Sequence, residues 1–396
     1  ILHFVIGQNM EERVIMEYLF WVAIAVIAYV YFGYPLLMTL LAAFSKRWQQ
    51  GDAMPSVSLL IAAYNEAAVI AEKVENSLQL DYPKEKLEII VASDGSDDGT
   101  NEIVQKYVEK GVILNVLKPR GGKTSALNRT FPQTHGSIMV FSDANTMYAP
   151  NAIRRLVRHF ADPSIGAVTG DVRLIDNTAG FGESEGLYYK YERHIQLMES
   201  RVNSVIGVDG AMYAIRRELF QSPSNNIILD DFVISMSVAR QGFRVIYDPE
   251  AIATEVATPN IKQEYRRKVR MIAGGFQALK QREGLPRWNQ FTLWFEYVSH
   301  KLLRWLAPFF LIGLFISNLL LFFKPLLLYK ASLSAQIIFY ILAILGWKWR
   351  KISNNVIFAV PFYFCILNAA SFVGFFKGML NKQQVTWRKA DRKPQK

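Results

Sequence analysis

An acidic residue follows a short apolar run at several points of the chain, and such positions suit nucleotide, metal or proton chemistry. Tyr64 and Glu66 come directly after the run at 57–62, and Asp94 comes after the run at 87–92. At the end of a buried strand, a carboxylate can accept hydrogen bonds from a base or a ribose, and the glycines around Asp94 let a backbone approach closely. Because the same residue types build turns and helix caps, a structural turn is the alternative interpretation.

Asp143 and Asn145 form an Asp-x-Asn motif directly after the apolar run at 137–141. Two side-chain oxygens so placed at the end of a strand can both reach one Mg²⁺ or Mn²⁺ ion, and such an ion neutralises a diphosphate. Because the second member is an amide, it contributes an oxygen but no charge. We therefore expect Asp143 to carry most of the metal binding.

Asp230 and Asp231 open a predicted helix at 232–240, which ends before Gly242. One of these carboxylates can act as a general base that takes the proton from a sugar hydroxyl. The alternative is structural, because aspartate commonly caps a helix whose other end is marked by glycine.

Two cationic segments have the residue types needed to hold a diphosphate. Lys123 follows Gly121 and Gly122 at the start of a predicted helix, where backbone N–H groups and a lysine suit a phosphate. A second group, able to form charge-assisted hydrogen bonds with a leaving group, lies just before Gly274 and Gly275 and comprises Arg266, Arg267, Lys268 and Arg270. The alternatives are a solvated lysine for the first segment and a basic helix on anionic lipid for the second.

These side chains need a framework that brings distant segments together, and the pattern from Pro55 to about Gln290 supplies one. Short β-branched runs alternate with helical stretches, which is typical of βαβ units. The predicted strands are at 57–62, 87–92, 113–117 and 137–141, and the predicted helices are at 66–80, 100–110 and 124–131. This alternation predicts a parallel sheet covered by helices, with ligands at the carboxyl ends of the strands.

Both ends of the chain contain long apolar stretches that predict membrane spans. The stretch at 18–44 carries no charged residue and is long enough, at about 1.5 Å per residue, to cross a hydrocarbon core of about 30 Å. Three later stretches, at 305–323, 333–347 and 356–376, have a similar composition. Strict alternation of four spans would place the basic tail outside the cytoplasm, against the positive-inside rule, unless one stretch is re-entrant or interfacial.

The composition agrees with a membrane protein that has a soluble middle. Hydrophobic residues make up 51% of the 396 residues and charged residues 20%, with a formal net charge of +11. Basic residues such as Lys46 and Arg47 flank the apolar stretches, which is typical of cytoplasmic loops, so we attribute the excess charge to the membrane and not to nucleic acid. The single cysteine, Cys365, excludes an intrachain disulfide and a cysteine metal site, which places the chemistry in the cytosol.

We therefore expect a multi-pass protein of the cell membrane whose catalytic domain faces the cytoplasm. No cleaved signal peptide is expected at the start of the chain. The expected segments are an N-terminal segment at 1–17, a transmembrane helix at 18–44, an α/β domain at 52–290, about three interfacial and transmembrane helices at 291–380, and a basic tail at 381–396.

Taken together, the order and spacing of these motifs resemble the membrane-bound family 2 glycosyltransferases, which include cellulose, chitin, hyaluronan and poly-N-acetylglucosamine synthases and ceramide glucosyltransferase. The likeness runs from the first span to the tail and is nearest to the poly-N-acetylglucosamine synthase-like branch. It implies a GT-A fold, a Rossmann-like α/β domain in the cytoplasm, joined to transmembrane helices. By the same resemblance, Tyr64, Glu66 and Asp94 hold the nucleotide, and Lys123 lies near the diphosphate.

The resemblance also assigns roles to the two acidic motifs. Asp143 with Asn145 is similar to the metal motif of the family. Asp231 falls on the final acid of the family's Thr-Glu-Asp motif, which is the general base, while Leu229 and Asp230 replace the first two residues of that motif.

On the acceptor side, Asp209 and Gly210 belong to a segment that looks like the family's acceptor-side loop. The Gln-x-x-Arg-Trp motif is best matched by the stretch in which Arg267 replaces the glutamine, Arg270 is retained for the diphosphate and Met271 replaces the tryptophan. The tryptophan is expected to form an aromatic platform beneath an acceptor sugar. Its replacement by methionine therefore argues against processive polymerisation.

The resemblance implies an inverting transfer of a sugar from a nucleotide-sugar donor, expected to be a UDP-sugar, to a polysaccharide or lipid-linked acceptor, with Mg²⁺ or Mn²⁺ as cofactor. The expected partners are the donor, a glycan or lipid acceptor and the lipid bilayer, but no nucleic acid; a homo-oligomer or an accessory export subunit would be further partners. Three alternatives stay open: a single-addition glycolipid transferase, a non-catalytic membrane subunit that binds a sugar nucleotide, and a transporter with a cytoplasmic domain.

Overall fold

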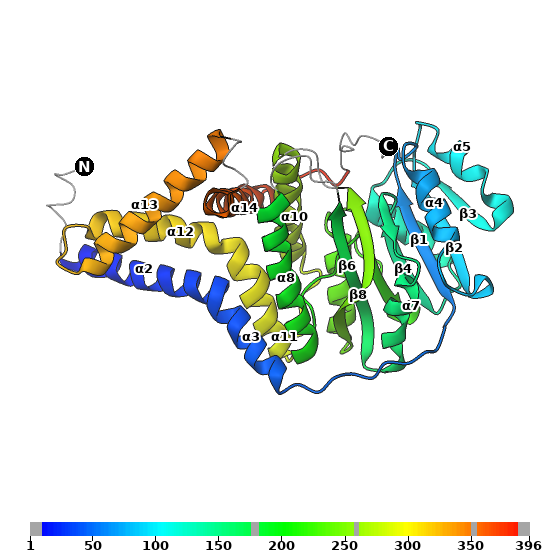
Figure 1. The fold of residues 1–396 in the computed structure, drawn as a ribbon, viewed down its shortest axis with the longest axis horizontal. Coiled ribbons are helices and arrows are strands. Elements are labelled where there is room, and N and C mark those ends of the chain that lie inside the picture. The colour runs from blue at the N-terminus through cyan, green and yellow to red at the C-terminus, as the bar shows by residue number, and fades with distance from the viewer. Residues whose placement is uncertain (1–9, 176–181, 257–260, 350–354, 387–396) are drawn as a thin grey trace.

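The computed structural model describes residues 10–175, 182–256, 261–349 and 355–386, so most of the predicted basic tail lies outside the described residues. Figure 1 shows a twisted sheet covered by helices on the right and a group of long helices on the left. Two helices, α8 (Gly182–Val202) and α10 (Ile261–Gln281), stand between these parts. The α/β domain with additional apolar helices, predicted from the sequence, is confirmed.

In the described part of the chain, eight strands form one sheet in the order β3-β2-β1-β4-β7-β6-β8-β5. Their bounds are β1 (Val57–Ala63), β2 (Leu87–Asp94), β3 (Val112–Leu117), β4 (Ile138–Asp143), β5 (Thr146–Tyr148), β6 (Ile165–Ile175), β7 (Met212–Arg216) and β8 (Arg244–Val256). The first four are parallel neighbours and are the four predicted strands. β7 is antiparallel to both β4 and β6, and β5 is antiparallel to β8.

Helices cover both faces of the sheet. One face carries α4 (Ile70–Leu78), α5 (Thr100–Gln105) and α7 (Ala152–Val157), and the other carries α6 (Lys123–Thr130), α9 (Asp230–Arg240) and α10. Along β1, Leu59 and Ile61 point into the first core and Leu60 into the second. Because strands of this kind are buried on both sides, they have near-continuous apolar sequences, which is why the sequence revealed them.

The loop after β1 is hydrogen-bonded to the loop after β2, and this shortens the predicted helix at 66–80. The N–H of Glu66 donates to Thr100 Oγ1 at 2.9 Å, and the N–H of Ala67 donates to Asp98 Oδ2 at 3.1 Å. The chain becomes helical only at Ile70. These bonds hold two of the carboxyl-terminal loops of the sheet side by side, where the first predicted site residues lie.

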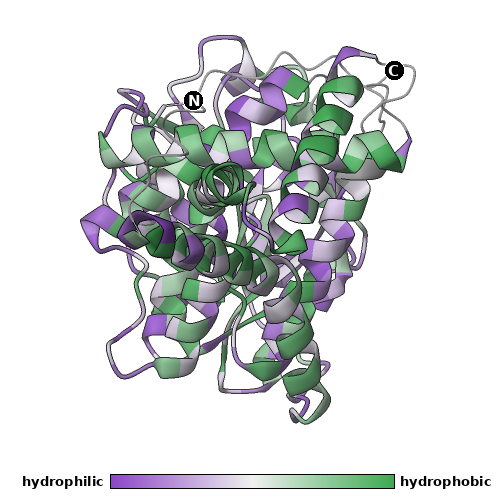
Figure 2. Cartoon of the chain, turned by 90° about the vertical axis from the view of Figure 1, so that its left-hand side faces the viewer, coloured by the Kyte–Doolittle hydropathy of each residue, from purple (hydrophilic) through white to green (hydrophobic). Residues whose placement is uncertain are grey.

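Within the described residues, four helical segments are long and apolar enough to cross a membrane. The first segment consists of α2 (Met10–Ala28), the π-helical η1 (Tyr29–Gly33) and α3 (Tyr34–Ala43). The second consists of α11 (Phe291–Glu296), the π-helical η7 (Tyr297–Leu302) and α12 (Leu303–Leu321). The third and fourth are the single helices α13 (Leu327–Lys348) and α14 (Val356–Met379). They face the viewer in Figure 2, where most of their residues are coloured as hydrophobic. The second segment starts earlier than the predicted 305 and so includes charged residues.

Helix α10 lies very close to α14. A Cβ atom added at Gly374 would be 2.7 Å from Ile272 Cβ, and one added at Gly378 would be 2.5 Å from the carbonyl oxygen of Ala273. Small residues of this kind allow two helix backbones to approach each other. The predicted cationic cluster, which lies on α10, is thereby attached to the fourth apolar helix.

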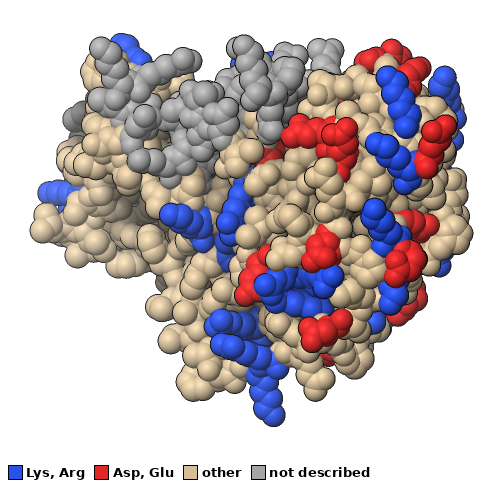
Figure 3. All heavy atoms as spheres, turned by 45° about the vertical axis from the view of Figure 1, so that its right-hand side comes forward, with Lys and Arg blue, Asp and Glu red and all other residues tan. Residues whose placement is uncertain are grey.

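Acidic and basic side chains are interspersed on the face of the sheet domain shown in Figure 3. The net charge of +11 does not form one continuous basic surface on that face. Mixed charge is usual for a solvated surface.

Candidate functional site

One cavity brings together nearly all of the predicted site residues. It has a volume of about 2040 Å³ and is lined by the ends of β1 and β4, the start of α9 and the first half of α10. The predicted residues that line it are Tyr64, Glu66, Lys123, Asp143, Asn145, Asp209, Gly210, Asp230, Asp231, Arg267, Arg270 and Met271. Such a position, at the carboxyl ends of parallel strands, is where α/β proteins bind their ligands.

Asp94 is the predicted site residue that does not line this cavity. Its side chain is buried and accepts hydrogen bonds from the N–H groups of Gly121 at 2.8 Å and Gly122 at 2.7 Å. The adjacent Arg120 places its guanidinium over the ring of Tyr64, 3.4 Å from the ring centroid. Asp94 therefore shapes the loop that leads into α6, while its direct contact with a nucleotide stays a prediction.

Lys123, the first residue of α6, connects the end of β4 to the predicted acceptor-side loop. Its Nζ lies 2.6 Å from Asp143 Oδ1 and donates to the carbonyl of Gly210 at 3.1 Å. Burial alone would lower the pKa of this lysine, but Asp143, Asp230 and Asp231 raise it above its ordinary value. The ammonium group therefore stays charged at the centre of the cavity, beside a predicted metal ligand.

The predicted metal motif is joined by a second carboxylate, which the sequence analysis missed. Asn145 Nδ2 donates to Glu255 Oε1 at 2.7 Å, and Glu255 pairs with Thr146 across β8 and β5. Asp143, Asn145 and Glu255 all line the cavity, and hard oxygen ligands of this kind suit Mg²⁺ or Mn²⁺.

The described residues contain no group of three or more His, Cys, Asp and Glu side chains that could hold a metal by themselves. Two carboxylates and an amide oxygen fit an ion that takes its other ligands from a diphosphate and from water, as Mg²⁺ commonly does. The residues present are therefore compatible with the metal that the family resemblance implies.

Asp230 and Asp231 form an acidic pair in the first turn of α9. The residue at the N-cap is Leu229, and no side chain caps the helix, so the interpretation of these aspartates as a cap is wrong. Asp231 Oδ1 accepts from the N–H of Phe232 at 2.8 Å, and a Cβ atom at Gly210 would lie 2.5 Å from Asp231 Oδ2. The predicted acceptor-side loop thus approaches this carboxylate closely.

Burial and like charge both act on this acidic pair. The pKa of Asp231 is raised to about 7, mainly by burial and next by the negative charge of Asp230. The positive charge of Lys123 acts in the opposite direction. The pKa of Asp230 is also raised, mainly by burial. A carboxylate that titrates near neutral pH can accept a proton at physiological pH, which is a property of general bases.

The cations of α10 have different surroundings. Arg267 forms hydrogen bonds with Glu264 at 2.8 Å and 2.9 Å, whereas Arg270 donates to the carbonyl of Val385 at 2.8 Å. Met271, at the position of the family's tryptophan, is 39% exposed and lines the cavity. The described start of the predicted tail therefore returns to the sheet domain and covers Arg270, an arrangement that the sequence did not predict.

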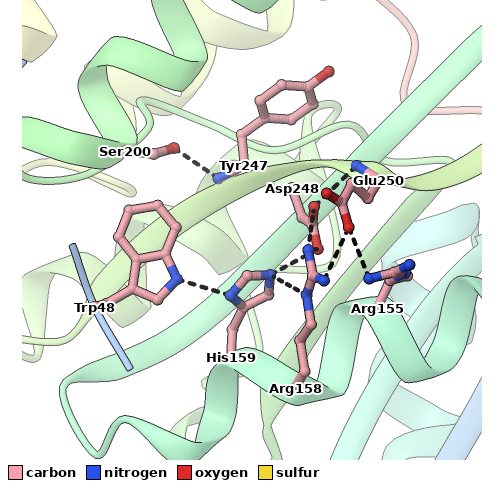
Figure 4. Close-up of polar contacts among 8 residues, drawn as sticks. All are labelled: Trp48, Arg155, Arg158, His159, Ser200, Tyr247, Asp248 and Glu250. Atoms are coloured by element: carbon pink, nitrogen blue, oxygen red, sulfur yellow. Dashed lines mark hydrogen bonds and ion pairs between the residues drawn. The ribbon is translucent and has the colours of Figure 1, made fainter. Parts of the chain in front are cut away.

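A second buried polar cluster lies outside this cavity (Figure 4). Trp48 Nε1 donates to His159 Nδ1 at 2.7 Å, and His159 Nε2 lies 2.7 Å from Asp248 Oδ2. Arg158 contacts Asp248 at 2.9 Å and Glu250 at 3.0 Å. Burial opposes ionisation of Asp248, but its bonds with His159 and Arg158 hold its pKa below the usual range.

Comparison with known proteins supports the assignment made from the motifs. Residues 55–274, more than half of the chain, match the family described as "Glycosyltransferase like family 2". The chain is 28% identical over 234 residues to poly-beta-1,6-N-acetyl-D-glucosamine synthase of Staphylococcus aureus, and 28% identical over 242 residues to the probable glycosyltransferase YdaM of Bacillus subtilis. These matches cover 58% of this chain and 56% and 57% of the relatives, so the chain spans little more than half the length of the curated relatives it matches.

A solved structure shares the fold over nearly the whole chain. Mannosyltransferase PcManGT from Pyrobaculum calidifontis, in complex with GDP-Man and Mn²⁺, superposes with a TM-score of 0.68 at 24% identity. The superposition covers 92% of this chain and 99% of that chain. The fold, the motifs gathered in one cavity and the match of residues 55–274 agree, and the chain belongs to the glycosyltransferase-like family 2.

Proposed function

We propose that this protein is an inverting glycosyltransferase of the membrane that takes a sugar from a nucleotide-sugar donor and adds it to an acceptor hydroxyl. The observation that carries the proposal is the single cavity lined by Lys123, Asp143, Arg270 and Asp231. A donor whose diphosphate lies near Lys123, Arg270 and an ion held by Asp143 would direct its sugar toward Asp231. The mannosyltransferase that shares this fold binds GDP-Man and Mn²⁺, which supports a donor of this class.

Asp231 is the proposed general base. The acceptor hydroxyl oxygen attacks the anomeric carbon, the bond from that carbon to the diphosphate oxygen breaks with its electron pair going to the diphosphate, and the hydroxyl proton goes to Asp231. Attack from the face opposite the leaving group inverts the anomeric configuration. The raised pKa of Asp231 suits this role, because a base that titrates near neutral pH is both available and strong enough.

The departing diphosphate needs positive charge, and the proposal assigns it to two side chains and an ion. Asp143, Asn145 and Glu255 would hold Mg²⁺ or Mn²⁺, which supplies charge beside the diphosphate when bound. Lys123 and Arg270 line the same part of the cavity, and electrostatic stabilisation of this kind is usually the largest catalytic term.

We further propose that the sheet domain faces the cytoplasm and that the four apolar helical segments form a multi-pass membrane region. Lys46 and Arg47 directly after the first segment support this orientation. A UDP-sugar is the proposed donor, since the chain is similar to an N-acetylglucosamine polymer synthase, and the acceptor is a polysaccharide or a lipid-linked glycan.

The test uses the full chain in nanodiscs with UDP- and GDP-sugars, with Mg²⁺, Mn²⁺ or a chelator. We expect one donor to release its nucleoside diphosphate only when a divalent ion is present, and we expect NMR to show a product of inverted anomeric configuration. A product of retained configuration would contradict the mechanism. Nucleotide binding without turnover of any donor would support the non-catalytic subunit instead.

A further inference from the structure

The cavity does not end at the reaction centre but continues among the apolar helices. All four helical segments contribute apolar side chains to this inner part, which is lined by Ile27, Leu314, Leu328, Phe339, Phe364 and Leu367. A space of this kind, with the catalytic aspartate at one end and apolar helices at the other, suits a molecule with two chemically different ends.

Several polar side chains in the inner part are already hydrogen-bonded within the protein. Gln336 Oε1 accepts from Asn318 Nδ2 at 3.1 Å, and Gln336 Nε2 donates to the carbonyl of Leu311 at 3.3 Å. Asn368 Nδ2 donates to the carbonyl of Phe364 at 3.0 Å. A polysaccharide carries hydroxyl groups along its whole length, and burying them without hydrogen-bond partners is unfavourable. An apolar tail meets no such cost.

Charged side chains gather where the inner part joins the reaction centre. Arg304 is hydrogen-bonded to Glu192, and His300 Nδ1 lies 2.6 Å from Glu199 Oε1. Lys301, one turn before Arg304, also lines the cavity and forms no ion pair with any described residue. Charged groups on a membrane helix are costly and are usually functional.

Two π-helical turns shape this junction. Lys301 belongs to η7, and the first apolar segment is π-helical at η1, whose Tyr31 and Phe32 line the same cavity. Tyr29 Oη and Ser299 Oγ, one from each turn, lie 2.8 Å apart. Single π-helical turns are rare and are frequently found at functional sites.

We propose that the acceptor is a membrane lipid with a phosphate-bearing head group, whose tail occupies the apolar inner cavity, whose phosphate contacts Lys301 and Arg304, and whose glycosylated end presents a hydroxyl to Asp231. This inference rests on the proposed glycosyl transfer and names its acceptor class. The hydroxyl proton goes to Asp231, the new bond joins the hydroxyl oxygen to the anomeric carbon, and the donor leaves as a nucleoside diphosphate, so the lipid phosphate itself is unchanged.

Binding can be measured apart from catalysis, with the full chain in phospholipid-free detergent and without donor or metal. The probes are farnesyl phosphate, farnesol and a soluble N-acetylglucosamine pentasaccharide, followed by native mass spectrometry. We expect farnesyl phosphate to bind at least about ten-fold more tightly than farnesol, because a charge-assisted contact adds affinity, and we expect the pentasaccharide not to displace it. Equal binding of the first two probes, or displacement by the pentasaccharide, would overturn the proposal.

Two variants locate the site. Lys301→Gln should weaken farnesyl phosphate binding by about ten-fold and leave farnesol binding unchanged, while Lys301→Arg should restore it. Ala335→Trp, which fills the inner cavity, should weaken both probes. Lys330→Gln is the matched control, because Lys330 is an exposed lysine of α13 that does not line the cavity. Normal farnesyl phosphate binding by both Lys301→Gln and Ala335→Trp would also overturn the proposal.

A separate measurement keeps the two proposals distinguishable. Nucleotide binding is measured on the same preparations with Mn²⁺ present and lipid absent. If nucleotides bind here and a donor is consumed in the nanodisc assay, but farnesyl phosphate does not bind, the lipid acceptor is wrong and glycosyl transfer stands. If farnesyl phosphate binds but no donor is bound, the proposed glycosyl transfer is wrong, and the proposed acceptor role of the lipid is then wrong too.

Discussion

Two buried polar clusters of the sheet domain have opposite electrostatic character. Around Asp248, each charged group faces a partner of the other sign, and the pKa of this carboxyl is lowered. Around Asp231, two neighbouring carboxyls lie together, Asp230 buried and Asp231 half-buried, and their pKa values are raised. The difference indicates that the cluster around Asp248 stabilises the fold. In the cluster around Asp231 the ionised form of the carboxyls is unfavourable, which is a property of catalytic groups.

The largest expected effect is the loss of turnover in Asp231→Asn. The amide cannot accept the hydroxyl proton, so we expect the transfer rate to fall by about a thousand-fold or more, within the usual range for general base catalysis. Donor binding, measured by calorimetry with Mn²⁺, should stay nearly unchanged. A variant that turns over normally would remove the base assignment.

The same variant also tests the energetic side of the comparison. A carboxyl whose pKa is raised on folding binds more protons in the folded state between its ordinary pKa and about 7, so its contribution to stability falls as the pH rises through this window. At pH 8 we therefore expect Asp231→Asn to unfold at the same temperature as the wild type or higher. A clear fall in unfolding temperature would mean that Asp231 stabilises the fold.

Asp248→Asn should lower the stability of the fold and leave turnover unchanged. It leaves Arg158 and His159 without their buried carboxylate, and breaking a buried pair in this way costs about 3 kcal/mol or more. For a domain of this size we expect the unfolding temperature to fall by about 10 °C. Turnover measured well below that temperature should be unchanged, and a selective loss of turnover would give this cluster a catalytic role.

Glu255→Gln tests the carboxylate that the sequence analysis missed. We expect Mn²⁺ affinity, measured by electron paramagnetic resonance with nucleoside diphosphate present, to fall by about ten-fold or more, as is usual when a residue in or next to a metal site is changed. Glu250→Gln is the matched control, because Glu250 belongs to the same strand but does not line the cavity. Unchanged Mn²⁺ binding by Glu255→Gln would exclude it from the metal site.

A smaller effect is expected on the pH profile. If Asp231 must be ionised, turnover should rise with pH and level off above about 7, with about a ten-fold loss one pH unit below that value. Asp230→Asn removes a neighbouring negative charge, so the rising limb should move to lower pH. A profile that does not move would mean that the two carboxyls do not interact.

The smallest effect is expected for Trp48→Phe. This change removes one hydrogen bond to His159 and keeps an aromatic ring, so the free energy of unfolding should fall by about 1 kcal/mol. Thermal unfolding of the two proteins in the same detergent measures it. A much larger loss would show that the segment before β1 contributes more than this bond to the fold.

The sequence was most informative where burial is uniform. β1, β2 and β4 are largely buried and were predicted from their apolar runs, as was the more exposed edge strand β3. β6 and β8 mix charged residues into their pattern and were missed, and the short apolar strand β7 was missed as well. Glu255 had no local signal, because its meeting with Asn145 depends on β8 pairing with β5. Lys301 and Arg304 did have a local signal in the sequence, because they lie just before an apolar stretch.

The close contact of α10 with α14 has a consequence for the lipids around the protein. In the proposed membrane region, the 24 residues of α14 are about 36 Å long, which exceeds a typical hydrocarbon core of about 30 Å, and tilting is one way for such a helix to match the bilayer. Gly374 and Gly378, which α10 contacts, lie near the end of that helix. A change in bilayer thickness would alter the tilt and shift Arg270 with α10, so the rate of the enzyme should depend on the acyl chain length of its host membrane.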